Sequence, residues 1–169
     1  MSAVPQRSSG LQVRVLSSAL GPIRIVAKDN AIKKIAFVQK SDAALGEPNA
    51  DGSPLVDRAA SQVESYLAGE RKGFDLPLAP EGSDHDQKVW RLLQSIPYGT
   101  TQSYGEIAQA MNAPGSARAV GLASGRNPIA IVIPCHRVIG ANGKLTGYAG
   151  GVQIKAQLLD LERMGLIPR

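Results

Sequence analysis

The segment SYGEIAQAMNAPGSARAVGLASG, residues 103–125, has the pattern of two short helices separated by a tight turn. Ser103 followed three positions later by Glu106 is a capping box, which predicts a first helix over 103–111. The NAPGS segment combines Asn, Pro and Gly and predicts a turn, and a second helix follows over 117–125. The stretch therefore predicts a helix-turn-helix, a motif found in many proteins that bind DNA.

The second predicted helix is unusual because its residues are almost all small: Ala117, Ala119, Gly121, Ala123, Ser124 and Gly125. Ser116 precedes it as a suitable N-cap, and Arg118 is its one long polar side chain. A helix that recognises base edges in the major groove carries Asn, Gln, Arg or Lys at several positions. This helix is instead suited to close approach, either to the minor groove of DNA or to another helix of the protein.

The N-terminal half predicts a small sheet followed by a helix. Three segments rich in Val and Ile have the length of strands and are separated by turn residues: LQVRVL (11–16), IRIVA (23–27) and IKKIAFV (32–38). Gly and Pro in residues 41–54 predict a loop, and apolar residues at helical spacing over 54–70 predict a helix. The first ten residues have no apolar stretch and predict a loose leader rather than a secretory signal.

Two further helices are predicted in the C-terminal half, over 86–96 and 151–165, from apolar residues at helical spacing. Residues 74–86 predict a linker, so we expect an N-terminal structural domain, 1–76, and a C-terminal domain, 77–169. The predicted fold class is α+β, with a three-stranded antiparallel sheet and a helix before a helical domain.

The charge of the chain is basic and unevenly distributed. The formal net charge is +5, and residues 84–169 carry nine Lys and Arg against five Asp and Glu, a net of +4. This concentration favours a polyanionic partner such as a nucleic acid, although positive charge also serves solubility. No run of eighteen apolar residues is present, so no membrane span is predicted. A single cysteine excludes an internal disulfide and a cysteine-built zinc site, and favours a reducing cytoplasm.

That cysteine, Cys135, lies in the segment NPIAIVIPCHRVIG, residues 127–140, directly after an apolar run. A cysteine nucleophile needs a base, and a turn at Pro134 and Cys135 would let the neighbouring His136 serve as one. A carboxylate that orients the imidazole would complete the set, with three acidic residues as candidates: Glu106, Asp160 and Glu162. The alternative is an inert thiol packed in the core.

Together these motifs resemble the O6-alkylguanine-DNA alkyltransferases, or methylated-DNA–protein-cysteine methyltransferases. The similarity is strong over about residues 84–165 and includes NPIAIVIPCHRVIGANGKLTGYAGG, residues 127–151, and the helix-turn-helix. It is weaker over 11–76. The resemblance implies a ribonuclease H-like N-terminal sheet and a winged-helix-like C-terminal domain. It also implies repair of double-stranded DNA, in which one alkyl group passes from O6-alkylguanine or O4-alkylthymine to Cys135 in a single turnover.

The resemblance implies a chemical role for four residues. Cys135 corresponds to the nucleophile, and His136 to a base that acts through a water molecule. Glu162 corresponds to the carboxylate that orients His136, and Asn127 to a residue that braces the active-site turn. No cofactor and no metal ion are implied, and the chain lacks the cysteines of the zinc site that some relatives carry.

The resemblance also implies how the damaged base is reached. Arg118 corresponds to a finger residue that enters the base stack when the nucleotide is flipped out of the duplex. Tyr104 corresponds to a residue that rotates the nucleotide and contacts the purine, and Tyr148 to the wall of the guanine pocket. The remaining implied contacts with DNA or substrate are Ser103, Ala117, Gly121, the backbone carbonyls of Cys135 and Val138, and the backbone N–H of Ala149.

One position departs from the family pattern, because Ala149 follows the pocket tyrosine where many members have a serine. A serine hydroxyl could donate to the guanine oxygen, and a lost side-chain hydrogen bond commonly costs about 0.5–1.5 kcal/mol. The backbone N–H of residue 149 remains a donor. We therefore expect Ala149 to alter substrate preference without abolishing transfer.

Three other functions are consistent with parts of the sequence. A lesion-binding relative without transfer activity would share the DNA-binding motif, but such relatives replace the cysteine. A cysteine hydrolase would use Cys135 and His136 and would turn over. A transcriptional regulator would use the helix-turn-helix to recognise a sequence. The alkyltransferase hypothesis implies a cytoplasmic monomer that associates with the nucleoid when acting, and it allows cooperative binding along DNA.

Overall fold

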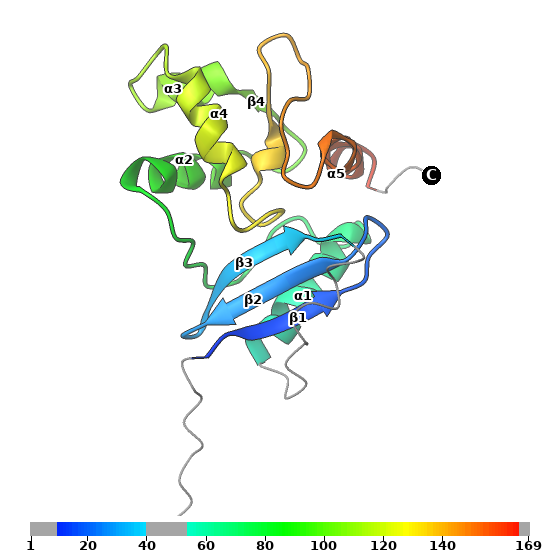
Figure 1. Cartoon of the computed structure of the whole chain (residues 1–169). Coiled ribbons are helices and arrows are strands. Elements are labelled where there is room, and N and C mark those ends of the chain that lie inside the picture. Colours follow the sequence, from blue (N-terminus) through cyan, green and yellow to red (C-terminus); the bar gives the residue numbers. More distant parts are fainter. Residues whose placement is uncertain (1–9, 40–53, 166–169) are drawn as a thin grey trace, which may run out of the picture.

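The computed structural model describes residues 10–39 and 54–165. Its N-terminal part contains a three-stranded antiparallel sheet in the order β1–β2–β3: β1 at Gln12–Leu16, β2 at Ile23–Lys28 and β3 at Ala31–Phe37. Figure 1 shows the three strands side by side in the order in which they occur in the chain, which confirms the predicted sheet. Asp29 and Asn30 join β2 to β3 with φ values of 53° and 63°, as a tight hairpin requires.

The predicted N-terminal leader and the predicted loop over 41–54 lie outside the described residues, apart from Gly10 at the end of the leader and Pro54, where helix α1 begins.

Helix α1, Pro54–Leu67, covers one face of the sheet (Figure 1). Its buried apolar side chains, among them Val56 and Val63, belong to the same apolar cluster as the strands. An ion pair of 2.6 Å between Arg14 and Asp57 joins the helix to β1. The sheet and the helix therefore form two packed layers, because each has one apolar face that must be buried.

The predicted helix over 54–70 is three residues too long, because α1 stops before Gly69, which has a φ of 79°. A Cβ atom at Gly69 would lie 2.2 Å from the backbone oxygen of Gly165. Glycine is needed here for its positive φ and for a close contact between two distant backbone segments.

The outer edge of β3 pairs with two segments from later in the chain. Ile32 exchanges backbone hydrogen bonds of 2.8 and 2.9 Å with residues 77–79. Ile35 does the same with residues 128–130, at 2.8 and 3.0 Å. This pairing covers the strand edge and ties the segment that precedes Cys135 to the N-terminal sheet.

The described C-terminal residues form four α-helices: α2 at Asp84–Gln94, α3 at Tyr104–Ala110, α4 at Ala117–Gly125 and α5 at Val152–Met164. The predicted helix-turn-helix and last helix are confirmed. Helix α2 starts two residues earlier than predicted, because Ser83 caps it and forms a capping box with Asp86, and it ends at Gln94, two residues before the predicted end. The predicted linker therefore ends at residue 83. No helix among the described residues is long and apolar enough to cross a membrane.

The two serines of the helix-turn-helix behave differently. The Ser103 hydroxyl accepts from the Glu106 N–H at 3.0 Å, and the Glu106 carboxylate accepts from the Ser103 N–H at 2.9 Å, so the capping box is confirmed. The predicted cap at Ser116 is wrong. Its ψ of 22° departs from the extended conformation of capping residues, and its hydroxyl donates to the carbonyl of Ala113 at 2.7 Å.

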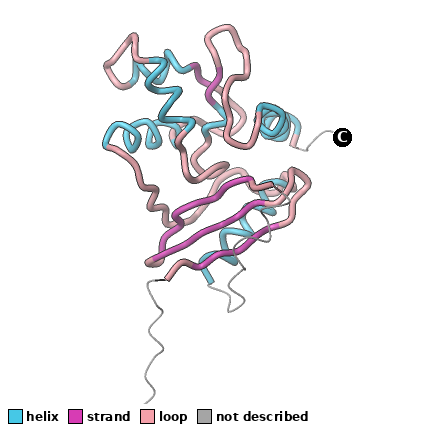
Figure 2. Tube along the Cα trace, viewed as in Figure 1, coloured by secondary structure: helices cyan, strands magenta, loops and turns pink. Residues whose placement is uncertain are grey.

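Two very short strands pair in parallel, β4 at Gln102–Ser103 and β5 at Val138–Ile139. Figure 2 shows this pair among the helices of the C-terminal part. Two residues are too few to show an alternating pattern, so the sequence did not predict them. Their pairing places the start of α3 beside the segment that follows Cys135.

Candidate active site

Cys135 begins a short 3₁₀ helix, η1, Cys135–Arg137, which follows Pro134 and leads into β5. The expected turn at Pro134 and Cys135 is therefore present. Cys135 is partly exposed, whereas His136 is fully buried. The turn thus separates a partly exposed Cys135 from an imidazole in the interior.

Asn127 holds this turn from one side. Its Nδ2 atom donates to the carbonyl of Ile133 at 2.8 Å and lies 3.2 Å from Cys135 Sγ. Its Oδ1 atom accepts from the N–H of Ile129 at 2.9 Å. A donor on sulfur stabilises the thiolate more than the thiol, so Asn127 both braces the chain and favours ionisation of Cys135.

The loop that Asn127 spans is strained at Ile131, which has a φ of 72°. A β-branched residue rarely adopts this conformation, which costs about 1–3 kcal/mol. The two backbone hydrogen bonds of Asn127, at residues 129 and 133, lie on either side of Ile131 and help to hold it. Strain of this kind is typical of functional sites.

His136 Nε2 lies 2.8 Å from Oε2 of Glu162 on α5, and both side chains have 0% exposure. An ionised carboxylate can only accept hydrogen bonds, so Nε2 donates and Nδ1 carries the lone pair. His136 Nδ1 is buried and has no hydrogen-bond partner among the described residues. The imidazole is thus oriented with one nitrogen available as a base.

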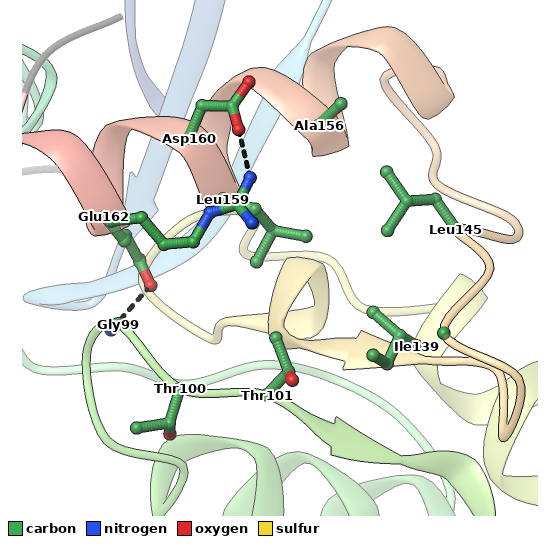
Figure 3. A pocket seen from close by; sticks show the side chains of 11 residues that line it. Gly99, Thr100, Thr101, Ile139, Leu145, Ala156, Leu159, Asp160 and Glu162 are labelled. Carbon is green, nitrogen blue, oxygen red and sulfur yellow. Dashed lines mark hydrogen bonds and ion pairs between the residues drawn. The ribbon is translucent and has the colours of Figure 1, made fainter.

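Glu162 accepts hydrogen bonds from three further parts of the chain. Arg137 donates through Nε to Oε1 at 2.9 Å and through Nη2 to Oε2 at 2.8 Å. The hydroxyl of Tyr66, on α1, donates to Oε2 at 2.5 Å. The N–H of Gly99 donates to Oε1 at 3.1 Å, a contact drawn in Figure 3. Both oxygens of this buried carboxylate are therefore satisfied, as burial of a charge requires.

The pKa shifts follow from this packing. Burial opposes ionisation of Glu162, but hydrogen bonds led by that of His136 outweigh it and hold the pKa of Glu162 well below its usual range. Burial lowers the pKa of His136 below its ordinary 6.5, against the opposing effect of Glu162. Burial raises the pKa of the Cys135 thiol, although the hydrogen bond from Asn127 favours the thiolate. At neutral pH a protonated thiol thus accompanies a neutral imidazole, the starting state for base catalysis.

Lys155 is a site candidate that the sequence alone did not indicate. It is fully buried on α5, and its Nζ donates to the carbonyl of Thr146 at 2.8 Å and to the hydroxyl of Tyr104 at 3.5 Å. Its positive charge favours the Cys135 thiolate. A signal was available, because Lys155 and Glu162 lie seven positions apart on the same buried face of the helix.

Tyr66 and Arg137 are the other two site residues that sequence reasoning missed. Tyr66 lies 96 residues before Glu162 and shares the apolar spacing of α1, so the sequence places it in the core without a role. Arg137 follows the Cys-His pair, yet its side chain turns inward to Glu162. Arg137 and Glu162 lie on different elements, so no spacing in the sequence could have shown that they form a pair.

The expected pocket wall rests on the N-terminal sheet. The ring of Tyr148 lies 6.3 Å from that of Phe37, measured between centroids. Gly150 fits between them, since a Cβ atom there would come within 2.9 Å of Phe37 and 3.1 Å of Tyr148. Ala149 is exposed and borders a cavity of about 320 Å³ together with Phe37 and Gly150.

The expected DNA contacts lie on α3 and α4. Arg118 and Leu122 are exposed, one turn apart on α4. Gly121 faces Tyr104, because a Cβ atom there would lie 3.8 Å from the tyrosine ring. Arg118, Gly121 and Tyr104 thus belong to one surface formed by the two helices, with Ser103 at the start of α3.

Of the three acidic candidates, Glu162 is the one that is hydrogen-bonded to His136. Glu106 is engaged in the capping box of α3. Asp160 forms an ion pair with Arg163 beside a cavity of about 450 Å³ that Glu162 also borders (Figure 3). Within residues 10–39 and 54–165, no three His, Cys, Asp or Glu side chains gather as a metal site.

Two sequence profiles of one family match the chain. The 6-O-methylguanine DNA methyltransferase DNA binding domain matches residues 84–164, and the ribonuclease-like domain of the same family matches residues 12–80. The methylated-DNA–protein-cysteine methyltransferase of Methanosarcina acetivorans is 48% identical over 149 residues, which cover 88% of this chain and 96% of the relative. That of Mycolicibacterium paratuberculosis is 48% identical over 157 residues, 90% of this chain and 93% of the relative.

Among solved structures, Mycobacterium tuberculosis OGT in complex with DNA is similar, with a TM-score of 0.82 and 44% sequence identity. The match covers 92% of this chain and 94% of that one. Sequence and fold thus agree over both the sheet and the helical part. The chain belongs to the 6-O-methylguanine DNA methyltransferase family.

Proposed function

We propose that this chain repairs alkylated DNA by transferring one alkyl group from O6 of guanine to Cys135. The observation that carries the proposal is the turn in which Asn127 donates to Cys135 Sγ while His136 presents a basic nitrogen. The names of the relatives support it, because they are methylated-DNA–protein-cysteine methyltransferases, and one similar structure is a complex with DNA. We assign DNA binding and chemistry to residues 77–169 and a structural role to residues 1–76.

In the proposed reaction, His136 takes the thiol proton of Cys135 through a bridging water. The thiolate attacks the alkyl carbon, so that the S–C bond forms as the O6–C bond breaks and guanine leaves with the bonding electrons. Guanine gains one proton, which balances the proton lost by the thiol. Glu162 stabilises the imidazolium that forms on His136. Because a thioether has no easy route back to a thiolate, each molecule acts once.

The proposal requires the damaged base to leave the duplex. Small residues of α4, Ala117 and Gly121, allow approach to the minor groove, and Arg118 fills the space that the base vacates. Tyr104 contacts the flipped purine, and its neighbour Lys155, 3.5 Å away, supplies positive charge and a proton donor. O4-alkylthymine enters by the same route.

The flipped guanine packs against Tyr148, with the N–H of Ala149 directed to its oxygen. The carbonyls of Val138 and Cys135 accept from the guanine amino group. The Cys135 carbonyl already accepts from the Val138 N–H within η1 and has a second lone pair for the base.

The other candidate functions are less consistent with the site. A sequence-reading regulator needs polar side chains on α4, whereas its exposed residues are Arg118, Leu122 and the small Gly125. A hydrolase would leave the exposed surface of α3 and α4 without a role. A lesion sensor would need neither the Asn127 contact to sulfur nor the oriented His136.

Intact-protein mass after mixing with excess duplex DNA that contains O6-methylguanine tests the proposal. We expect a gain of one methyl group that stops at one per molecule and is absent in Cys135→Ala. Tight lesion binding without a mass change would contradict transfer and favour a lesion sensor. Repeated turnover of a small ester would favour a hydrolase.

A further inference from the structure

A tyrosine of the N-terminal part reaches the proposed catalytic residues. Tyr66 lies on the last turn of α1 and is fully buried. Its hydroxyl donates to Glu162 Oε2 at 2.5 Å and lies 3.4 Å from His136 Nε2. The ring is held between Phe74 and Tyr98, at centroid distances of 5.4 and 6.1 Å. The hydroxyl therefore has one fixed position, directly at the contact between the carboxylate and the imidazole.

The direction of this hydrogen bond is determined by burial and charge. Burial and the neighbouring Glu162 raise the pKa of Tyr66 far above its ordinary 10, so the phenol keeps its proton. Glu162 is ionised and can only accept. Oε2 thus receives hydrogen bonds from Tyr66, His136 and Arg137, which occupy it fully and leave it no capacity to take a proton from the imidazole.

This arrangement selects the tautomer of His136. With Glu162 as an acceptor, the proton of the neutral imidazole stays on Nε2, and the lone pair stays on Nδ1, the nitrogen without a described partner. The hydroxyl also shares the negative charge of Glu162, which limits how strongly the carboxylate holds a second proton on the ring. The imidazole is thus kept neutral before the reaction and can accept the thiol proton during it.

We propose that Tyr66 is a positioning residue, whose hydroxyl fixes Glu162 and shares its negative charge, and so keeps His136 neutral with Nδ1 free to act as a base. The proposal rests on the proposed transfer to Cys135 and gives the N-terminal part a positioning role in it. Tyr66 acts through Glu162 and His136 and does not contact the substrate.

The test is Tyr66→Phe, which keeps the ring and removes the donor. We expect the single-turnover rate with O6-methylguanine duplex to fall about tenfold, because a hydrogen bond to a charged group is lost. The acid limb of the rate–pH profile should move to higher pH, because Glu162 with one donor fewer holds a proton on His136 more strongly. The groups that face His136 and set this limb are Tyr66 from α1, Glu162 and Lys155 from α5, and Arg137 from η1.

Tyr98→Phe is the matched control, because phenylalanine keeps the ring that packs on Tyr66 and removes a hydroxyl that, among the described residues, makes no hydrogen bond to Glu162. In this control, the single-turnover rate should stay within twofold of the wild-type rate, and the acid limb should not move. In a Glu162→Gln background, adding Tyr66→Phe should cause no further loss. A wild-type rate and limb in Tyr66→Phe, or an equal loss in both backgrounds, would overturn the proposal.

Nitrogen-15 NMR of the His136 ring gives a readout that needs no alkyl transfer. We expect a protonated Nε2 and an unprotonated Nδ1 in the folded wild-type protein, and the opposite tautomer would also overturn the proposal. Absence of any alkyl transfer in the wild type would refute the proposed function. The pH at which the His136 ring takes up its second proton, compared by NMR between the wild type and Tyr66→Phe, would still decide the role of Tyr66.

Discussion

The buried cluster around Glu162 and the exposed face of α4 contribute to the proposed reaction under opposite physical conditions. Glu162 and His136 have no exposed side-chain surface, and Glu162 is bonded to α1, η1 and the Gly99 turn. Arg118 and Leu122 lie on a single helix and face solvent. In the cluster the protonation state of each residue depends on its hydrogen-bonded partners, so a substitution at one residue should affect the others. On α4 the effects of single changes should be separable.

The largest effect is expected from Glu162→Gln. Arg137, whose side chain is 8% exposed, would lose its counter-charge, and breaking a buried pair costs about 3–5 kcal/mol. His136 would also lose the negative charge that stabilises its imidazolium, so transfer should slow by at least about 100-fold. Urea unfolding and single-turnover kinetics measure the two effects. Asp160→Asn on the same helix is the control, because its ion pair is partly exposed and should be worth less than about 1 kcal/mol. Similar losses of stability and of transfer rate in Glu162→Gln and Asp160→Asn would contradict the distinction between the buried cluster and exposed residues.

Asn127→Ala should have the next largest effect. It removes hydrogen bonds at residues 129 and 133 beside the strained Ile131, and each is worth about 1 kcal/mol, so the free energy of unfolding should fall by about 2 kcal/mol. Loss of the donor to Cys135 should also raise the pH at which the thiol is alkylated by a small reagent. Asn142→Ala in an exposed loop serves as the control. An unchanged pH profile would show that Asn127 is structural alone.

Acid should destabilise the cluster in two steps. Between pH 7 and 5 the unfolded chain protonates residue 136 with an ordinary pKa near 6.5, whereas burial lowers the pKa of His136 in the folded state. The unfolded state then binds more protons, so stability falls as the pH falls. Glu162 adds a second loss below about pH 4.3, since its folded pKa is also lowered. Melting temperatures across this range test it, and His136→Gln should remove the first step.

Arg118→Ala should reduce transfer from duplex DNA by about tenfold through loss of a charged DNA contact, while transfer from free O6-benzylguanine stays unchanged. The free energy of unfolding should change by less than about 0.5 kcal/mol, because the residue is exposed. Arg163→Ala, an exposed arginine of α5, is the control. A parallel loss on the free base would show that α4 and the cluster are not separable.

Ala149→Ser should have the smallest effect. Ala149 is exposed, and a new hydroxyl there can contribute about 0.5–1.5 kcal/mol to a bound guanine, enough to change the ratio of rates on methylated and benzylated guanine several-fold. Competition between the two adducts measures this ratio. Equal rates before and after substitution on both adducts would contradict the expected role of Ala149.

The predictions that the structure confirmed rest on signals within a few residues of each other. The capping box at Ser103 and the apolar spacing of α5 both depend on near neighbours. The errors have local causes too. Ser116 has the right type for a cap but the wrong backbone angles, and β4 is too short to show a period. The sequence narrowed the orienting carboxylate to three residues, and geometry singled out Glu162.

By itself, the sequence determined the three strands of the N-terminal sheet, the α-helices, the single thiol with its neighbouring imidazole, and the small face of α4. These follow from local backbone preferences and from residue type. Only the tertiary structure decided that Tyr66, Gly99 and Arg137 meet at Glu162, and that Lys155 lies beside Tyr104. Hydrogen bonds act over about 3 Å, so partners up to 96 residues apart acquire a shared function only when the sheet and helices have packed.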